Sequence, residues 1–257
     1  MQDMNLHCRA IVLSVLLMSV VYVTPHAQTN AAKYEIGINA GTLIYQGDLS
    51  SSYLGSYHLH SLKPAVGLFA SRAINNNFAI RANLAFGKIS DDESTYSSPA
   101  YKRQRNFEFN TSIAEFSALL VWNVLGNSTD ESVRKIVPYL FGGIGMSFLN
   151  VHRDWSKFNR VSFPPTSSIG IGLAADSAHS LPGAIPVIPI GAGIRYAIGP
   201  KLSVAGEFNY RFAFNDYLDG FSQAVNPKTK DKYYGISIGL IYTFNKKSGI
   251  DCPKVGK

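Results

Sequence analysis

The amino-acid sequence predicts an all-β protein, an eight-stranded up-and-down antiparallel transmembrane β-barrel. Three observations support this fold class. Eight segments alternate between apolar residues and small or polar residues with a period of two. The links between these segments alternate between short and long, as in bacterial outer-membrane barrels. Aromatic residues make up 12% of the chain and charged residues only 16%, whereas soluble domains carry about 25% charged residues.

The chain begins with a segment that we expect to be a signal peptide, over residues 1–27. An apolar run of about 14 residues, "AIVLSVLLMSVVYV", precedes "TPHAQ", which places the small residue Ala27 at the expected cleavage position. A membrane anchor is the alternative, but the run is short for a spanning helix. Cys8 would leave with the signal peptide, and Cys252 would remain, so no disulfide framework is expected.

The predicted strands fill residues 28–245, which we expect to form one barrel domain. The clearest strand is "YYGISIGLIYTF" at residues 233–244, where one face is apolar with aromatic ends and the other face is small or polar. Such a strand has lipid on one side, the barrel interior on the other, and aromatic residues at both membrane interfaces. Segments of this kind occur at residues 34–45, 63–74, 78–90, 106–123, 136–152, 186–197, 201–214 and 231–244.

The links between the strands predict which end of the barrel faces which compartment. The links at 75–77 and 198–201 are tight turns, and the link at 125–135 is of moderate length. Four links are long and rich in Ser, Tyr, Asp and Pro: residues 46–62, 91–105, 153–185 and 215–230. Bacterial barrels have short periplasmic turns and long external loops. Both ends of the barrel are therefore expected on the periplasmic side, with residues 246–257 as a short periplasmic tail.

A soluble eight-stranded barrel such as a lipocalin is the main alternative fold. In a soluble barrel the apolar face turns inward and the other face meets water. Here the less apolar face is rich in glycine, which suits a crowded interior but weakens a solvent-exposed strand. These glycines are Gly37, Gly41, Gly67, Gly87, Gly143, Gly145, Gly191, Gly193, Gly235 and Gly239. The pattern therefore favours the membrane barrel.

Charged side chains on the same face predict a polar network inside the barrel. They are Arg81, Glu115, Arg195, Glu207 and Arg211. Because both signs of charge occur, these groups can pair, as buried charges must. The interior of an eight-stranded barrel is just filled by side chains, so a wide diffusion pore is not expected.

The formal net charge of +7 bears on the partners of the chain. A basic chain can bind nucleic acid, but an exported one meets the phosphates of lipopolysaccharide and other acidic surfaces. We therefore expect outer-membrane lipid and lipopolysaccharide as partners, and no nucleic acid.

Two aspartates follow the seventh predicted strand in "NDYLDG", namely Asp216 and Asp219. Their spacing does not match a helix-loop-helix calcium site, which needs acids at alternate positions and a closing Glu. A catalytic pair and a contact with a partner remain open on spacing alone. The favoured interpretation is a turn, in which Asp caps backbone N–H groups and Gly220 adopts a positive φ.

Histidines in or near the loops raise the possibility of an enzyme with a site at the rim, which would also use Asp48 or Asp216. They are His58, His60, His152 and His179. "HLH" at 58–60 places two imidazoles on one side of a strand, but no third ligand is near in sequence. The chain contains neither G-x-S-x-G nor H-E-x-x-H, and its G-x-G pairs lie inside strands. We expect no catalytic residues, metal or cofactor.

Several stretches together resemble the PorG-like outer-membrane barrels of bacteria that run type IX secretion and gliding. They are "YQGDL", "PYLFGGIGMSF", "GPKLSVAGEFNYRFAFNDYLDGFS" and "DKYYGISIGLIYTF", and they span nearly the whole mature chain. In "NDYLD", Asn215 stands where the family usually has Thr. By this resemblance the marked positions, with a role in shaping loops or contacting a partner, are Gly47, Asp48, Asp216, Tyr217, Leu218 and Asp219.

The resemblance implies a non-enzymatic barrel of the cell outer membrane, acting as a structural or accessory component of a type IX-like protein secretion complex. Periplasmic ring and lipoprotein components of the machine would be its partners. The alternative is a general surface barrel that binds ligands or envelope components through its long outer loops. Neither the identity of the partner nor any modification of Cys252 follows from the sequence.

Overall fold

The computed structural model describes residues 33–50, 62–96, 98–126, 135–226 and 230–245. The predicted signal peptide (1–27) and tail (246–257) lie outside the described residues, as do His58, His60 and Cys252.

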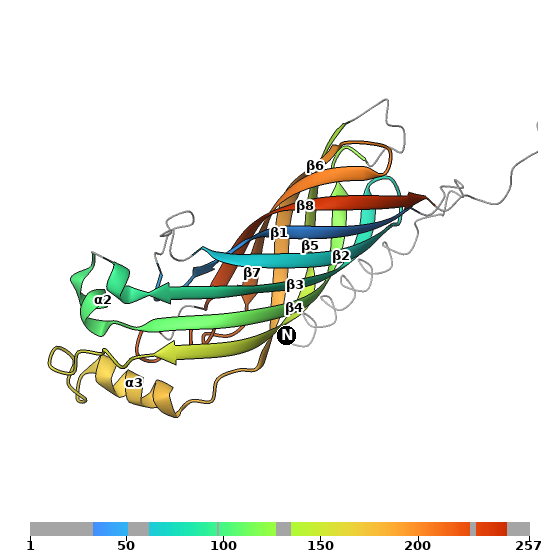
Figure 1. Ribbon diagram of the computed structural model, residues 1–257. Coiled ribbons are helices and arrows are strands. Elements are labelled where there is room, and N and C mark those ends of the chain that lie inside the picture. The colour runs from blue at the N-terminus through green and yellow to red at the C-terminus, as the bar shows by residue number, and fades with distance from the viewer. Residues whose placement is uncertain (1–32, 51–61, 97, 127–134, 227–229, 246–257) are drawn as a thin grey trace, which may run out of the picture. The chain divides into compact units, whose positions relative to one another are not determined.

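Eight strands form one closed barrel in which every strand pairs antiparallel with its neighbours in the chain and β1 pairs with β8 (Figure 1). The strands are β1 Lys33–Gln46, β2 Lys63–Ala73, β3 Phe78–Asp92, β4 Glu108–Asn123, β5 Ile136–Asp154, β6 Ala184–Ala197, β7 Leu202–Ala213 and β8 Lys232–Asn245. This topology confirms the predicted fold class and the order of the strands. The observed ends lie close to the predicted ones; β5, for example, ends at Asp154 instead of residue 152.

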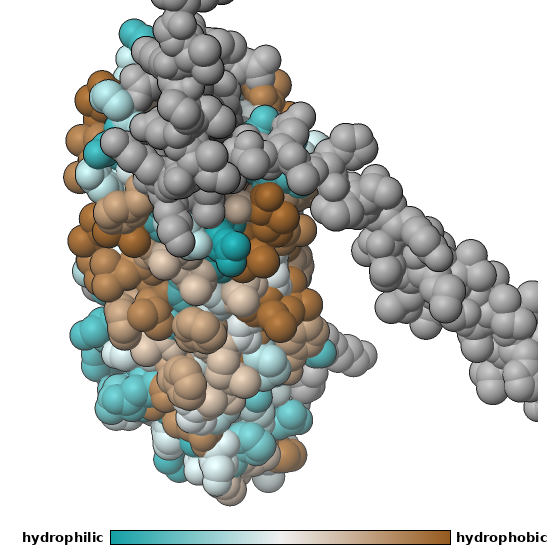
Figure 2. All heavy atoms as spheres, turned by 90° about the vertical axis from the view of Figure 1, so that its right-hand side faces the viewer, coloured by the Kyte–Doolittle hydropathy of each residue, from teal (hydrophilic) through white to brown (hydrophobic). Residues whose placement is uncertain are grey.

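The outward-facing side chains of the strands form an apolar belt. Ile144 is 70% exposed and Ile238 is 68% exposed, and both are surrounded by other exposed aliphatic and aromatic side chains. Figure 2 shows hydrophobic residues gathered over the middle of one face and hydrophilic ones toward its lower end. So continuous an apolar surface has lipid, not water, as its stable surroundings. The belt therefore identifies a transmembrane barrel of the outer-membrane type.

Aromatic side chains lie at both edges of the belt. At the end with the short turns, Tyr34 pairs across strands with Phe244, and Phe78 with Trp122. At the other end, the outward aromatics are Phe86, Phe148, Phe212 and Phe214. Aromatic side chains are typical of the two membrane–water interfaces, where the ring contacts lipid on one side and the polar headgroup region on the other.

Two groups of buried apolar side chains fill the interior. The first lies toward the short turns and consists of Phe69, Ala79, Leu119, Val121, Tyr139, Phe141, Ala205 and Ile241. The second lies toward the long loops and includes Leu43, Tyr45, Ile89, Phe109, Leu218 and Phe221. Glycine makes room for these rings: a Cβ at Gly37 would overlap the ring of Phe69, and one at Gly193 would overlap that of Tyr139. The interior glycines thus permit large side chains in a narrow barrel.

The long loops lie at one end of the barrel together with three short helices: η2 Glu93–Thr95, α2 Ala100–Arg105 and α3 Ser168–Ala178. Figure 1 shows α2 and α3 at this same end. We call the described loop segments here the outer cap: residues 47–50, 93–96, 98–107, 155–183, 214–226 and 230–231. Among the described residues, no helix is long and apolar enough to cross a membrane.

Candidate functional site

Three buried ion pairs lie in the barrel interior that the structure describes, and the first joins strands that are not neighbours in the sheet. Arg81 of β3 places Nη1 2.6 Å from Oε1 of Glu207 on β7. Tyr139 of β5 donates its hydroxyl to the same oxygen at 2.6 Å. The Arg81 guanidinium also lies over the ring of Phe69, 4.1 Å from its centroid. These contacts tie opposite walls of the barrel together.

The second pair joins Arg195 of β6 to Glu35 of β1. The contact is bidentate, with Nη1–Oε1 at 2.7 Å and Nη2–Oε2 at 3.0 Å, a geometry that strengthens such pairs. Lys33 Nζ lies 3.8 Å from the same carboxylate. Sequence reasoning named Arg195 but missed Glu35. The available signal was its position, two residues before Gly37 and hence on the same face of the strand.

The third pair lies nearer the outer cap. Arg211 of β7 places Nε 2.7 Å from Oε2 of Glu115 on β4. Tyr233 of β8 donates its hydroxyl to this oxygen at 2.9 Å and lies 2.9 Å from the hydroxyl of Ser147. All five predicted interior charges therefore lie inside the barrel, paired in this way together with Glu35. Full pairing and hydrogen bonding offset the cost of burying the charges.

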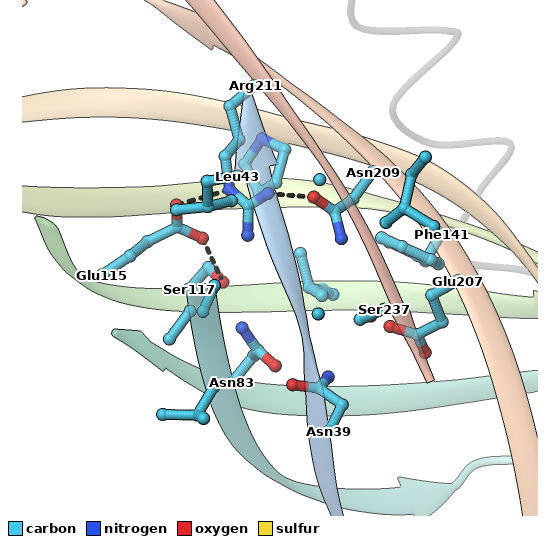
Figure 3. A pocket seen from close by; sticks show the side chains of 18 of the residues that line it. Asn39, Leu43, Asn83, Glu115, Ser117, Phe141, Glu207, Asn209, Arg211 and Ser237 are labelled. Carbon is cyan, nitrogen blue, oxygen red and sulfur yellow. Dashed lines mark hydrogen bonds and ion pairs between the residues drawn. The ribbon is translucent and has the colours of Figure 1, made fainter. Parts of the chain in front are cut away.

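A small cavity lies between the first and third of these ion pairs (Figure 3). Its volume is about 50 Å³, which is room for a few water molecules and no larger solute. Side chains that line it include Asn39, Asn83, Ser117, Asn209 and Ser237. Figure 3 shows Asn39 and Asn83 pointing into the same space. The described interior is thus a filled core with one small cavity between two of its ion pairs.

A buried cluster closes the barrel at the outer cap, with the Tyr45 hydroxyl at its centre. This hydroxyl lies 2.7 Å from Oδ2 of Asp219 and 2.6 Å from Oδ1 of Asp231. The backbone N–H of Phe221 donates to Asp219 at 2.8 Å, and that of Leu218 donates to Asp231 at 3.1 Å. The cluster therefore joins the first strand, the β7–β8 loop and the start of the last strand. Asp231 was not predicted.

The protonation of this cluster follows from its geometry. The Tyr45 hydroxyl has one proton and can donate it to one carboxylate only. The second short contact therefore requires a protonated carboxyl group that donates to the tyrosine oxygen. Burial, and then the charge of the neighbouring Asp231, raises the pKa of Asp219. Burial, followed by the charges of Asp216 and Asp48, raises the pKa of Asp231. One proton shared by Asp219 and Asp231 accounts for both the two short contacts with Tyr45 and the raised pKa values.

Two glycines shape the chain around this cluster. A Cβ at Gly47 would overlap the Tyr45 hydroxyl and the Asp231 carboxylate, so a larger residue there would displace them. Gly220 has φ of +86°, which confirms the positive φ expected of it. Its carbonyl oxygen accepts a 2.6 Å hydrogen bond from Arg153 Nη1.

Asp48 lies next to the cluster and is half-buried. Burial, and then the charge of Asp216, raises its pKa to about 6. Lys102 of α2 holds the same stretch of chain by donating to the carbonyl oxygens of Leu49 at 3.0 Å and Ser50 at 2.9 Å. The "GDL" stretch of "YQGDL", residues 47–49, is therefore held between α2 and the barrel mouth.

Helix α3 holds the β7–β8 loop through Asp176, which is fully buried. Its carboxylate accepts hydrogen bonds from three successive backbone N–H groups, at residues 222–224, with distances of 3.2, 3.0 and 2.9 Å. Tyr217 also donates to it at 3.2 Å and stacks on His179, with ring centroids 4.0 Å apart. Sequence reasoning missed Asp176, although it is the one acidic residue of an otherwise small and apolar helix.

The remaining predicted cap residues have structural contacts of their own. Leu218 is fully buried, and its carbonyl oxygen accepts a 2.6 Å hydrogen bond from the Thr111 hydroxyl. Asp216 accepts a 2.6 Å hydrogen bond from the Ser222 hydroxyl, and burial raises its pKa. The six predicted positions thus lie together at the barrel mouth.

A separate pocket of about 230 Å³ lies within the β5–β6 loop. Its lining includes Trp155, Phe158, Arg160, Phe163 and Leu173. Phe158 stacks on Phe163 with ring centroids 5.7 Å apart. The pocket offers aromatic faces and one cation.

The described residues contain no group of three or more His, Cys, Asp or Glu side chains arranged to hold a metal ion. His152 faces outward on β5, and His179 stacks on Tyr217. The structure thus places His152 on the outer wall of the barrel and His179 beside Tyr217, the residue that follows Asp216.

A protein-family model described as a domain of unknown function, DUF6089, matches residues 12–251. No curated protein matches the sequence. Several solved barrels are similar in structure. Ail of Yersinia pestis, in complex with the heparin analogue sucrose octasulfate, has 12% identity and a TM-score of 0.44, covering 83% of this chain and 99% of its own. Neisserial surface protein A has 12% identity and a TM-score of 0.46, covering 82% and 97%. The outer membrane enzyme PagL has 12% identity and a TM-score of 0.39, covering 81% and 98%.

Proposed function

This chain belongs to the DUF6089 family, and we propose that it is a non-enzymatic outer-membrane scaffold, an accessory component of a type IX-like protein secretion complex. Export by the N-terminal signal peptide would deliver it to the cell outer membrane. Lipid and lipopolysaccharide would surround the barrel. The periplasmic ring components of the machine would bind its periplasmic end, and lipoprotein components at the cell surface would bind the outer cap.

The observation that carries the scaffold role is the preorganised outer cap. The cluster of Tyr45, Asp219 and Asp231, the Lys102 clamp and the Asp176 contacts hold four loop segments in one arrangement. A partner that binds such a surface pays little entropy for ordering it. The filled interior supports the same role. Because side chains and ion pairs fill the eight-stranded barrel, a partner can bind its surface, but a solute cannot pass through it.

The assignment to secretion is supported by where the resembling motifs lie. "YQGDL" contributes Tyr45, Gly47 and Asp48, and "NDYLD" contributes Asp216 and Asp219, and these residues build the barrel mouth. The part of the sequence that resembles PorG-like barrels most is thus the part that gives the outer cap its shape. Function drawn from such a resemblance is an argument by association, so it needs a direct test.

The test is the secreted proteome of a strain that lacks the gene, compared with the same strain complemented by the intact gene. We expect cargo proteins to accumulate in the periplasm and to return to the medium on complementation. An unchanged secreted proteome would rule out the secretion role. A third strain, complemented by Val161→Asp, tests the cap surface, because Val161 is 94% exposed and its replacement removes almost no packing. Levels of folded barrel in the membrane serve as the control.

A second candidate function, ligand binding through the outer loops, is favoured by the pocket in the β5–β6 loop. Aromatic faces at Trp155, Phe158 and Phe163 with a nearby guanidinium suit a flat or sugar-like ligand that carries negative charge. Trp155 reports on this pocket by fluorescence, with Trp155→Phe as the blank. Quenching by acidic envelope glycans that is lost in Arg160→Ala, together with normal secretion in the deletion strain, would favour this function over the scaffold.

A further inference from the structure

A groove on the outer wall of the barrel runs over β2, β3, β4 and β5, on the lipid-facing side. We call it the wall groove; its outward-facing residues are Pro64, Val66, Phe86, Lys88, Ser112, Ala114, Phe148 and Asn150. Its volume is about 670 Å³, and most of its lining is apolar. It is separate from the outer cap and from the interior cavity.

The register of the strands explains the groove. Phe86, Ala114 and Phe148 are cross-strand partners in one row, so the methyl group of Ala114 lies between two phenyl-bearing positions. Strands lie about 4.8 Å apart, so β3 and β5 are about 10 Å from each other across β4. The two rings and Val66 form the walls, and Ala114 forms a low floor. The space suits a hydrocarbon chain lying along the barrel.

The end of the groove toward the outer cap is polar. Lys88, Ser112 and Asn150 form the next cross-strand row, and all three side chains face outward. Within the described part of the chain, none of the three has a side-chain hydrogen bond or an ion pair. An ammonium, a hydroxyl and an amide thus stand side by side with free donors.

The height of this row places it at the level of lipid headgroups. Strands rise about 3.3 Å per residue and tilt about 40° in a barrel, so the row lies about 5 Å beyond the last aromatic row. The stem of Lys88 can lie along the apolar wall while its ammonium reaches the interface. Because the long loops lie beyond this row, the leaflet concerned is the outer one.

The rows beyond Lys88 limit the kind of headgroup. Asn110 and His152 are cross-strand partners in the next row toward the cap, and both side chains face outward. Their amide and imidazole groups can donate hydrogen bonds to a ligand. One row farther on, Glu108 pairs with Asp92 on one side and Asp154 on the other, and their charges repel a second phosphate there. A headgroup with one phosphate at the Lys88 row and a hydroxylated sugar beside Asn110 and His152 would have a partner for the donors of both rows. A small phospholipid headgroup would leave Asn110 and His152 unused.

We propose that the wall groove binds one lipopolysaccharide molecule of the outer leaflet. One acyl chain lies over Ala114 between Phe86 and Phe148, and a phosphate accepts hydrogen bonds from Lys88 Nζ, Ser112 Oγ and Asn150 Nδ2. This inference needs only that the barrel lies in the outer membrane, and it does not depend on the secretion role. A normal or defective secreted proteome therefore leaves it untouched.

The test is native mass spectrometry of the full-length mature barrel, refolded in detergent and titrated with lipopolysaccharide that lacks O-antigen. Dephosphorylated lipopolysaccharide and phosphatidylglycerol are titrated in parallel. Lys88→Gln is expected to weaken binding about tenfold, the scale of one lost charged hydrogen bond. Ala114→Leu fills the floor of the groove and is expected to weaken binding by a similar factor.

Each variant has a matched control on the same wall. Arg72→Gln removes an outward-facing cation at the opposite end of β2. Ala118→Leu enlarges an outward-facing alanine of β4 that lies four residues, or two outward positions, farther from the cap than Ala114. Both are expected to bind as the unaltered barrel does. Equal losses in variant and control, or equal binding of dephosphorylated lipopolysaccharide, would overturn the proposal. Tighter binding of phosphatidylglycerol than of lipopolysaccharide would also overturn it. Should Lys88→Gln fail to fold, Lys88→Arg keeps the charge, and retained binding there supports the phosphate contact.

Discussion

At the scale of single residues, the Tyr45 hydroxyl controls how the outer cap is closed. It bridges two buried aspartates that can stay close only while they share a proton. A pair that shares one proton carries a single charge, whereas two ionised carboxylates on the same hydroxyl repel each other strongly in a dry site. The closure of the cap is therefore linked to pH.

The sign of this linkage follows from the direction of the pKa shifts. Burial and neighbouring acids raise the pKa of Asp219 and Asp231 above the ordinary value near 4. The folded cap thus binds a proton that the open loop releases, so its stability is greatest below about pH 4 and is lost as pH rises through the raised pKa. We expect faster amide exchange at Phe221, after correction for intrinsic rates, at pH 8 than at pH 5.

Asp231→Asn is the control for this prediction. The amide is neutral at all these pH values and still offers an oxygen to the Leu218 N–H and a donor to Tyr45. We expect its exchange at Phe221 to change less between pH 5 and pH 8 than in the unaltered protein, the remaining change coming from Asp48, whose pKa is raised to about 6. A flat profile in the unaltered protein, or an equal slope in the variant, would contradict a titrating aspartate pair.

At the scale of secondary-structure elements, the ion pairs bridge strands that do not share hydrogen bonds in the sheet. Glu207 of β7 receives Arg81 of β3 and Tyr139 of β5, and Arg195 of β6 reaches Glu35 of β1. The backbone ladder alone joins only neighbouring strands. These side chains therefore brace the cross-section of the barrel and keep its narrow interior filled.

Glu207→Gln tests this brace. It leaves the buried guanidinium of Arg81 without a counter-charge, which typically costs about 3–5 kcal/mol of folding free energy. We expect the free energy of unfolding in urea to fall by this amount. The folded fraction at each urea concentration is measured from gel mobility, because the folded barrel migrates differently from the heat-denatured chain. The double variant Arg81→Met with Glu207→Gln is expected to recover part of the lost free energy, because no unpaired charge remains. Additive losses in the double variant would show that the two residues act independently.

Helix α3 contributes to the cap through Asp176. Asp176→Ala removes the acceptor for three backbone N–H groups at residues 222–224. The two buried ones, at Ser222 and Ala224, each cost about 1–3 kcal/mol when left unsatisfied. We expect the β7–β8 loop to become sensitive to limited proteolysis while the barrel stays folded. Ser177→Ala is the matched control, because within the described segments its hydroxyl donates a hydrogen bond to Ala174 of the same helix and to no other group. Cleavage at the same rate in both variants would refute the role of Asp176.

At the scale of the whole molecule, the barrel is an apolar belt around a core of paired charges. The belt supplies the affinity for lipid and the core supplies rigidity, so the outer cap remains as the surface open to a partner from outside. The cavity of about 50 Å³ between the ion pairs is too small to pass ions in file.

We therefore expect the reconstituted barrel to show no steady conductance in planar lipid bilayers. Glu115→Ala with Arg211→Ala removes one of the ion pairs that close the interior toward the cap. Brief openings of small conductance are expected in that double variant only. Steady conductance of the unaltered barrel would contradict a closed interior.

The sequence by itself determined the strands, their number, the side that faces lipid and the end that carries the long loops. Each of these depends on local properties: a period of two along a strand, the lengths of the links, and glycine on the crowded face. Strands such as β3 and β5 run two residues farther than predicted, because pairing continues beyond the apolar belt through polar rows such as Asn110 and His152. Periodicity of apolar residues carries no information about those rows.

The tertiary structure alone decided which charges meet. Arg195 could have paired with any carboxylate of the interior, and only the closure of β1 against β8 brings Glu35 to it. Asp231 lies far along the chain from Tyr45, to which it is hydrogen-bonded. Asp176 likewise lies far along the chain from the β7–β8 loop that it holds. Register and closure are long-range properties that a single stretch of sequence does not contain, so the partners of the predicted residues became known only once the barrel was complete.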